Sequence, residues 1–338
     1  MKRILYGSAI LVLLLCASQV SRGQQEKLAQ TGLKFLNVSS DPRAVGMGDA
    51  MTGVEGVSPA QFSNPAGMAR QTSTLNFWGG NTKWFADITH FQGSLTISPE
   101  HGMYGVFGLS MQSVNYGEID ETIFDQSDPK GYQDLGTFKP TGLMIGASYA
   151  RALSDRFAIG GTVKYVTQNL GDGVVSVDTS NNRTTVKNKL DVLAFDFGVL
   201  YRTGFKSLEF GMSVRNFSKE VKYQQEQFQL PLIFKIGLSM NVLDLMDVDP
   251  KMHSLLLAVE ATHPRDFREQ VNVGGEYVFA EILALRAGYM FANDLYDFTT
   301  GLGVRYSLEG VEIGIDYSYT PFKENFSAVN RIAVQMSF

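Results

Sequence analysis

The residues Val311–Thr320 decide the fold of this 338-residue chain, and they read Val-Glu-Ile-Gly-Ile-Asp-Tyr-Ser-Tyr-Thr. Apolar or aromatic side chains occupy every second position, and polar or small ones fill the positions between them. Successive side chains of a β-strand point to opposite faces, so one face of this strand is apolar and the other is polar. An apolar outward face and a polar inward face are typical of a strand in a transmembrane β-barrel.

The same alternation recurs from Leu75 to the last residue, in units of about ten residues that each end in a turn. A soluble β-sandwich also alternates, but its outer faces meet water. Here the apolar face is nearly uncharged in all the strands. We therefore expect an all-β antiparallel outer-membrane β-barrel of about fourteen strands, near residues 73–79, 87–98, 103–113, 141–152, 156–168, 189–202, 207–217, 232–243, 253–263, 269–279, 282–292, 298–307, 311–320 and 329–338.

The connections between these strands alternate in length, as they do in barrels with short periplasmic turns and longer external loops. The links at residues 99–102, 153–155, 280–281 and 308–310 are short. Those between them are longer, notably at residues 114–140 and 169–188, and residues 244–252 form the one oversized periplasmic turn. A sandwich has no reason to show this order.

Strand parity places charged side chains of both signs inside the barrel. We expect them to pair across strands and with a filler, because a barrel of this width is too wide for its own side chains to fill. A selective ion path is the alternative, but it would favour an excess of one sign. The inward charged residues are Lys164, Asp196, Glu209, Arg215, Lys235, Glu260, Glu276, Arg286, Arg305, Glu312, Asp316 and Arg331.

Residues 24–71 precede the first strand, lack strand alternation and are too apolar for a disordered leader. Asp41-Pro42 and Asn64-Pro65 each predict a helix start, with Asp or Asn as the cap and Pro at the first helical position. Between these starts, Ala and Gly residues recur at positions 44, 46, 48 and 50, which leaves the backbone thin enough to lie against a wall. We expect a folded hatch inside the barrel.

Three elements of this region carry a family resemblance: Lys34-Phe35-Leu36, the run from Pro42 to Ala50, and the run from Ser63 to Ala69. Together they resemble the N-terminal region of the PorV/PorQ family, which is related to FadL-type barrels. The resemblance assigns a hatch motif to Pro42, Arg43, Gly46, Met47 and Gly48 and to Asn64, Pro65, Ala66 and Gly67.

The resemblance implies a role in type IX secretion. Such barrels receive the C-terminal sorting domain of an exported protein and carry it from the translocon to the surface attachment complex. The implied partners are outer-membrane lipid, secreted proteins with sorting domains and other secretion-system barrels. A FadL-like importer of hydrophobic compounds, which shares the hatch, is the alternative function, and a purely structural barrel is a third.

Both ends of the chain predict export to the outer membrane. Lys2 and Arg3 precede a largely apolar run with small residues before Gln24, so residues 1–23 resemble a cleaved signal peptide. The single cysteine, Cys16, lies in this stretch, so the mature chain has no disulfide. Phe338 ends an amphipathic strand and resembles the signal that outer-membrane assembly machinery recognises. The expected domains are the signal peptide (1–23), the hatch (24–71) and the barrel (72–338).

The sequence favours no enzyme chemistry and no cofactor. The four histidines are scattered without metal-ligand spacing, and no serine has the flanking glycines of a nucleophile elbow. Without a basic run, nucleic acid is not an expected partner. An acidic stretch suggests a solvated loop more than a calcium site, because its spacing fits no ligand pattern. Its acidic residues are Glu118, Asp120, Glu121, Asp125, Asp128 and Asp134.

Overall fold

The computed structural model describes residues 31–126, 128–177, 183–323 and 326–338. The expected signal peptide and Cys16 lie outside these residues. Among the described residues, no helix is long and apolar enough to cross a membrane.

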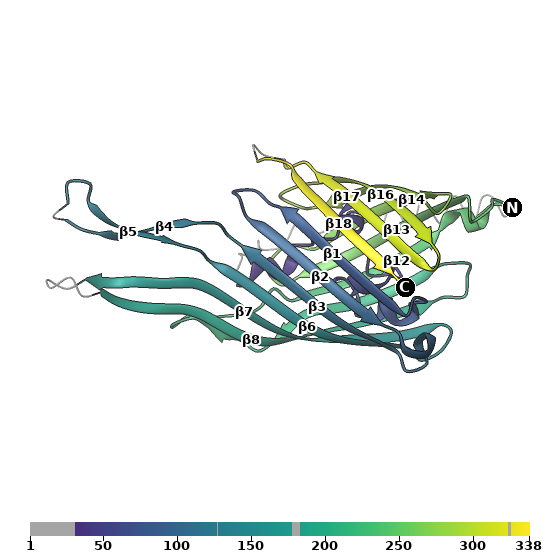
Figure 1. The fold of residues 1–338 in the computed structure, drawn as a ribbon, viewed down its shortest axis with the longest axis horizontal. Coiled ribbons are helices and arrows are strands. Elements are labelled where there is room, and N and C mark those ends of the chain that lie inside the picture. The colour runs from purple at the N-terminus through teal and green to yellow at the C-terminus, as the bar shows by residue number, and fades with distance from the viewer. Residues whose placement is uncertain (1–30, 127, 178–182, 324–325) are drawn as a thin grey trace.

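The described residues form a closed antiparallel barrel, in which the first strand pairs with both the second and the last (Figure 1). This confirms the expected barrel of fourteen strands. The barrel strands are β1 (Leu75–Lys83), β2 (Thr89–Ile97), β3 (Val106–Asn115), β6 (Thr141–Ala152), β7 (Phe157–Val177), β8 (Arg183–Arg202), β9 (Glu209–Ser218), β12 (Ile233–Asn241), β13 (His253–Pro264), β14 (Gln270–Phe279), β15 (Leu283–Phe291), β16 (Phe298–Leu308), β17 (Val311–Thr320) and β18 (Val329–Ser337). Two short helices lie in the links, η4 (Pro99–Gly102) and η5 (Val242–Leu245).

The faces of the strands follow the predicted parity. On β17, the Ile315 side chain points outward and is 52% exposed, whereas its neighbour Asp316 points inward and is 6% exposed. The exposed side of the barrel is apolar, and the inward side holds the charged and polar residues. The end that carries the short links and Phe338 is therefore the periplasmic end, and the opposite end is external.

Two of the expected long loops are instead largely strand. β7 and β8 remain paired as far as Val177 and Arg183, and residues 114–140 contain a separate hairpin of β4 (Ile119–Phe124) and β5 (Tyr132–Phe138). The sequence did not predict these segments because outside lipid a strand needs no uninterrupted apolar face. A smaller hairpin, β10 (Val221–Lys222) with β11 (Gln227–Phe228), lies in the next external link.

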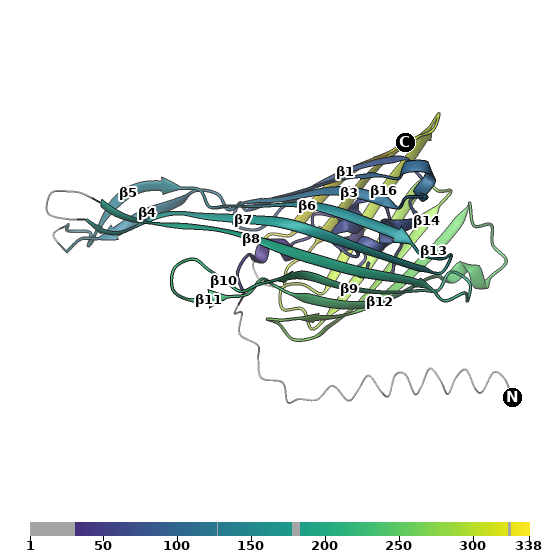
Figure 2. The same cartoon turned by 90° about the horizontal axis from the view of Figure 1, so that it is seen from below.

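We call the β4–β5 hairpin together with the extension of β7 and β8 beyond Asn169 and Lys189 the wing. Figures 1 and 2 show it as a long projection from one side of the external mouth. The other external links are short by comparison.

Residues 31–71, here the N-terminal segment, lie inside the barrel (Figure 2). The segment contains η1 (Lys34–Asn37), α2 (Pro42–Gly46), η2 (Ser58–Phe62) and η3 (Pro65–Arg70). It starts at the external end, where Gly32 N donates to Gln229 O, and it ends beside the periplasmic start of β1. Helix starts after Asp41 and Asn64 are confirmed, while η1 and η2 were not expected from the sequence.

Candidate functional site

The surface between the N-terminal segment and the inner wall is the candidate functional site. The two halves of the predicted motif both lie on it, but they do not meet. Residues 42–48 contact β14 to β17, and residues 64–67 contact β6 to β8. Because β16 and β7 are seven steps apart in the fourteen-strand ring, the two halves brace opposite walls.

The first half begins with a capped helical turn. The Asp41 carboxylate accepts a hydrogen bond of 2.9 Å from Arg43 N, and Pro42 occupies the first helical position. The buried Asp41 carboxylate lies close to the negative charge of Asp316 and to the positive charges of Arg43 and Arg286. The turn is therefore fixed locally by its own sequence and electrostatically by the wall.

After this turn the backbone of the segment touches the backbone of the wall. A Cβ atom on Gly46 would lie 3.1 Å from Gly301 Cα, and one on Gly48 would lie 3.0 Å from Val273 O. The wall glycine Gly288 in turn faces the backbone nitrogen of Gly48 so closely that a methyl group there would overlap it. Glycines on both sides thus permit a close backbone contact, which a side chain at Gly288 would disrupt.

Arg43 joins this contact to a buried charge network. Its guanidinium donates to both oxygens of Glu276, at 2.7 and 3.0 Å. Arg286, whose side chain is fully buried, donates to Glu276 at 2.6 Å and to Asp316 at 2.5 Å. Because an unpaired charge in this interior would be costly, the four groups stabilise one another only as a set.

Two further networks hold the segment elsewhere. Glu260 accepts from Thr52 N at 2.9 Å and pairs with Lys235 at 2.8 Å. Lys164 pairs with Asp196 at 2.5 Å. Beside this pair, Asn216 lies at a bulge in β9 with a φ of 61° and donates to Asn37 of the segment at 3.1 Å. These four inward charges are therefore paired, as expected. Arg215 on β9 instead donates to Leu36 O of the segment at 3.4 Å and has no ion pair among the described residues.

The second half of the motif is centred on Asn64. Its side chain accepts from Ala66 N at 3.1 Å, which caps η3, and donates to Thr52 O at 2.7 Å and to Val199 O on β8 at 3.0 Å. One amide thereby joins a helix, another part of the segment and the wall. Pro65 occupies the first position of η3. Gly67 packs closely against Ala60, because a Cβ atom added to Gly67 would lie 3.2 Å from the Ala60 Cβ.

Uncharged wall side chains also hold the segment, and the sequence reasoning missed them. Gln92 accepts from Ser40 N at 2.8 Å and donates to Val38 O at 3.2 Å, and Gln112 donates to Phe35 O at 2.5 Å. These amides supply partners for a backbone that has little regular structure of its own. Gln92 and Gln112 lie at inward positions of their strands, which could have predicted this role. The prediction considered only the charged inward residues.

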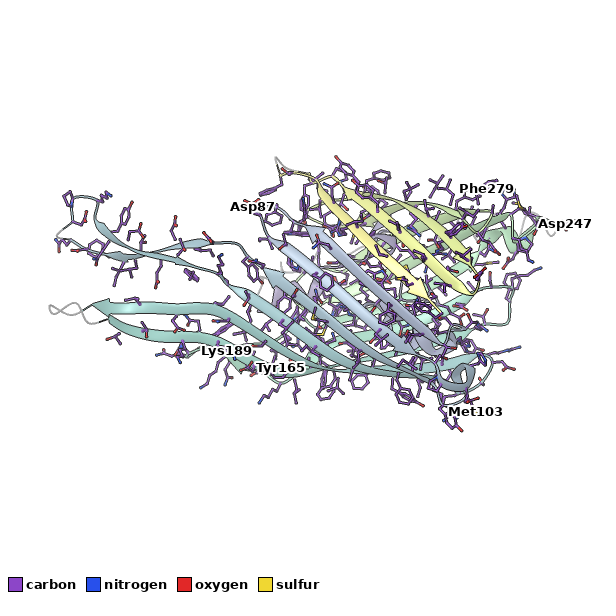
Figure 3. The ribbon with its side chains drawn as sticks, in the orientation of Figure 1. Asp87, Met103, Tyr165, Lys189, Asp247 and Phe279 are labelled. Carbon is purple, nitrogen blue, oxygen red and sulfur yellow. The ribbon has the colours of Figure 1, made fainter. Side chains whose placement is uncertain are left out.

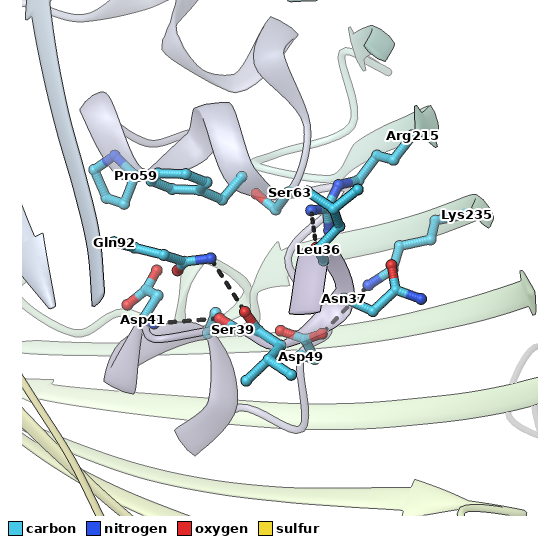
Figure 4. Close-up of a pocket in the computed structure, with 13 residues that line it drawn as sticks. Leu36, Asn37, Ser39, Asp41, Asp49, Pro59, Ser63, Gln92, Arg215 and Lys235 are labelled. Atoms are coloured by element: carbon cyan, nitrogen blue, oxygen red, sulfur yellow. Dashed lines mark hydrogen bonds and ion pairs between the residues drawn. The ribbon is translucent and has the colours of Figure 1, made fainter. Parts of the chain in front are cut away.

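Among the described residues, two small cavities lie beside the segment within the barrel, with volumes of about 10 Å³ and about 20 Å³. Two larger openings, of about 630 Å³ and about 450 Å³, lie at the periplasmic end of the segment, beside Arg70 and Thr72. Polar and charged side chains line the first of the small cavities, among them Asn37, Asp41, Gln92, Arg215 and Lys235 (Figure 4). A volume of about 10–15 Å³ suffices for one water molecule. Neither small cavity has room for a hydrophobic compound in this conformation.

Phe338 lies apart from this surface, at the periplasmic rim. Its backbone N donates to Leu75 O at 2.8 Å, and its ring packs edge-on against Phe77 with a centroid distance of 6.4 Å. The last residue is thus tied to the first strand. Its role as an assembly signal stays a prediction.

The acidic stretch of residues 118–134 belongs to the wing. Glu118 pairs with Lys139 at 2.7 Å, and Glu121 accepts from Val174 N at 3.2 Å. Within the described parts of the chain, no three His, Cys, Asp or Glu side chains come together as a metal site.

Comparisons with known proteins give one family and one fold. The family model described as type IX secretion system protein PorV matches residues 21–254. No curated protein matches the chain.

Among solved structures, the toluene transporter TodX of Pseudomonas putida has a TM-score of 0.59 at 12% identity, covering 93% of this chain and 99% of that one. The toluene transporter TbuX of Ralstonia pickettii has a TM-score of 0.55 at 13% identity, covering 88% and 98%. A FadL homologue of Pseudomonas aeruginosa has a TM-score of 0.53 at 13% identity, with the same coverage. At such identities these structures share the fold alone.

Proposed function

Because the chain belongs to the PorV family of type IX secretion system proteins, we propose that it binds the C-terminal sorting domain of exported proteins and carries them from translocon to attachment complex. The protein is an outer-membrane β-barrel, and its family and fold are those of transport barrels, not of an enzyme family. The implied partners are secreted proteins with sorting domains and other barrels of the secretion system.

The filled lumen is the observation that carries this proposal. Binding of benzene in a protein interior has needed an apolar cavity of about 150 Å³. The two cavities that the described residues enclose beside the N-terminal segment have volumes of about 10 and 20 Å³, and charged residues line them. The larger openings lie outside them, at the periplasmic end. A barrel filled in this way acts through its surface, so cargo docks on it and does not pass through it.

We propose further that the N-terminal segment is a permanent hatch. Its backbone touches wall glycines on opposite sides, and its charges and amides are paired with the wall. Removing it would leave several buried charges without partners, and each such loss would destabilise the barrel by about 3–5 kcal/mol. This argues for a hatch that stays in place during the transport cycle.

The second candidate function is import of a hydrophobic compound. Its support is the shared fold with barrels described as toluene transporters. Import requires the segment to move, whereas the shuttle requires it to stay. The two functions can therefore be separated by locking the segment to the wall.

A disulfide provides this lock. Ser58 of the segment donates a hydrogen bond to Asn76 on β1, so we choose these two neighbouring positions for the paired cysteines. The only native cysteine, Cys16, lies in the expected signal peptide (residues 1–23), so a processed Ser58→Cys/Asn76→Cys variant has no competing thiol. The single variants serve as matched controls.

In a deletion strain we expect secreted proteins with sorting domains to accumulate unprocessed in the periplasm, while toluene uptake is unchanged. The oxidised double-cysteine variant should restore secretion as well as the wild type does. Secretion that is normal in the deletion strain, with toluene uptake lost and restored only when the disulfide is reduced, would replace the shuttle by the importer.

A further inference from the structure

The wing extends beyond the membrane. A strand needs about 9–11 residues to cross the bilayer, and β7 and β8 have 21 and 20. The outward face of β8 becomes charged at Asp191 and Lys189, where Tyr165 on β7 donates to Asp191 at 2.8 Å (Figure 3). Because charge on the lipid-facing side is unfavourable, lipid ends at this level and the rest of the wing is in water.

The β4–β5 hairpin is not needed to close the barrel. It forms a two-stranded sheet of its own, whereas the strands on either side of it, β3 and β6, pair with each other up to Asn115 and Thr141. An isolated two-stranded hairpin is only marginally stable in water. Without contacts to the rest of the molecule or to a partner, this hairpin would therefore be only marginally stable outside the membrane.

One face of this hairpin is already covered. Glu121 reaches across to Val174 N, and the Phe138 ring lies against Gly171, so this face packs on the extension of β7. The opposite face has no such cover from the described residues. Its strand pairs are Phe124 with Tyr132, Thr122 with Asp134, and Asp120 with Thr137.

The uncovered face combines apolar and acidic groups. Phe124 is 78% exposed and its partner Tyr132 is 46% exposed, and both Asp120 and Asp134 are exposed on the same side. Neighbouring exposed apolar groups rimmed by polar residues mark interaction sites, and aromatic residues are enriched at binding hot spots. The two carboxylates select a partner whose surface is basic beside an apolar patch.

We propose that this face of the wing is the docking surface for the sorting domain of the exported substrate, through a basic and apolar patch on that domain. The inference rests on the proposed shuttle function and assigns its binding site. The Phe124 and Tyr132 rings supply the buried centre of the contact, and Asp120 and Asp134 steer and orient the substrate. The site lies on the water-exposed side, where a substrate that has left the translocon can reach it.

Three variants and their controls test the proposal on the purified barrel in detergent, with a recombinant sorting domain from a protein secreted by the same organism as the probe. The first replaces residues 117–139 by Asn-Gly, which keeps Tyr116 N bonded to Pro140 O. The second is Phe124→Ser/Tyr132→Ser. The third, Asp120→Asn/Asp134→Asn, removes two charges but keeps the Asp134 side-chain oxygen that accepts from Gly136 N.

The controls are Met103→Ser and Asp247→Asn, exposed positions at the far end of the molecule (Figure 3). We expect the deletion and the aromatic variant to weaken binding by on the order of tenfold or more. The charge variant should weaken it less and should abolish its dependence on salt. Both controls should bind as the wild type does, and all variants should keep the heat-modifiable mobility of a folded barrel.

Two negative results have different meanings. If the wild-type barrel does not bind the sorting domain at all, the proposed function fails. If the wild type binds and the deletion variant binds equally well, the substrate docks elsewhere, and the docking site is overturned while the shuttle stands. Retained substrate binding with loss of binding to another secretion-system barrel would reassign the wing to that partner.

Discussion

At the scale of single residues, glycines decide where the N-terminal segment can lie. Gly288 on β15 leaves room for the backbone of Gly48, and Gly274 on β14 does the same for the carbonyl oxygen of Met47. The glycines of the segment meet them from the other side. The wall and the segment are thus complementary at the level of main-chain atoms.

Adding one methyl group tests this contact. In Gly288→Ala the new Cβ would overlap Gly48 N, so we expect overpacking that costs about 1–3 kcal/mol and displaces the segment. Digestion of the segment by added protease and susceptibility to small hydrophilic antibiotics should both rise. The matched control is Gly161→Ala, whose Cβ would lie 3.5 Å from its nearest neighbour, an ordinary contact. Identical behaviour of the two variants would mean that the segment is held by other contacts.

The sequence predicted local features of the site and missed distant ones. The caps at Asp41 and Asn64 depend on residues two positions away, so they could be read from the chain. The partner of Arg43 is Glu276, which lies 233 residues further on. Parity places Glu276 inside the barrel, but only the register between strands decides which inward charges meet.

At the scale of the element, β17 shows how two adjacent residues stabilise the barrel by different means. Ile315 contacts lipid, so Ile315→Arg should destabilise by about 2–4 kcal/mol if the residue lies near the bilayer midplane. Asp316→Asn weakens the bond from Arg286, which keeps Glu276 as a second partner, so a loss of about 1–3 kcal/mol is expected.

Urea unfolding of both variants in lipid vesicles measures these effects. The Ile315 variant should depend on bilayer thickness, and the Asp316 variant should not. Ser318→Ala is the inward control, because the buried Ser318 hydroxyl has no hydrogen-bond partner within the described chain. If Ser318→Ala destabilised as much as Asp316→Asn, burial and not the ion pair would be the cause.

Element lengths follow from the surroundings as much as from the residues. The strands within lipid were predicted to within a few residues, because lipid demands an apolar side chain at every second position. Beyond Asn169 that demand ends, and β7 continues without it. Hydrogen bonds to β8 then maintain the strand, and these leave no pattern in side-chain polarity.

At the scale of the whole molecule, the count and closure of the strands were predictable, but the direction of the N-terminal segment was not. Each strand has its own alternation of apolar and polar residues, so all fourteen strands of the barrel could be found from the sequence. The segment has no repeating pattern. Its direction depends on contacts at its two ends, such as the Lys34–Asp266 ion pair at the external end and the Arg70–Glu55 pair near the periplasmic end.

Cysteine labelling tests that direction. With its only native cysteine in the expected signal peptide, the mature chain accepts single cysteines without background. In intact cells, a membrane-impermeant maleimide should label Lys34→Cys and the exposed wing control Phe124→Cys. Thr72→Cys, at the periplasmic exit of the segment, should react only after the outer membrane is permeabilised. Labelling of Thr72→Cys but not of Lys34→Cys in intact cells would reverse the orientation.

The seam between β1 and β18 has a consequence for the order of assembly. Residue 31 lies at the external end of the barrel and residue 71 at the periplasmic end, so the segment passes through the whole lumen. Threading a free end past the paired charges of a finished ring would require those charges to separate. We expect the sheet to wrap around the segment instead, with β18 meeting β1 only once the interior is occupied. Closure of the barrel, the last step of biogenesis, then depends on the N-terminal segment being in place.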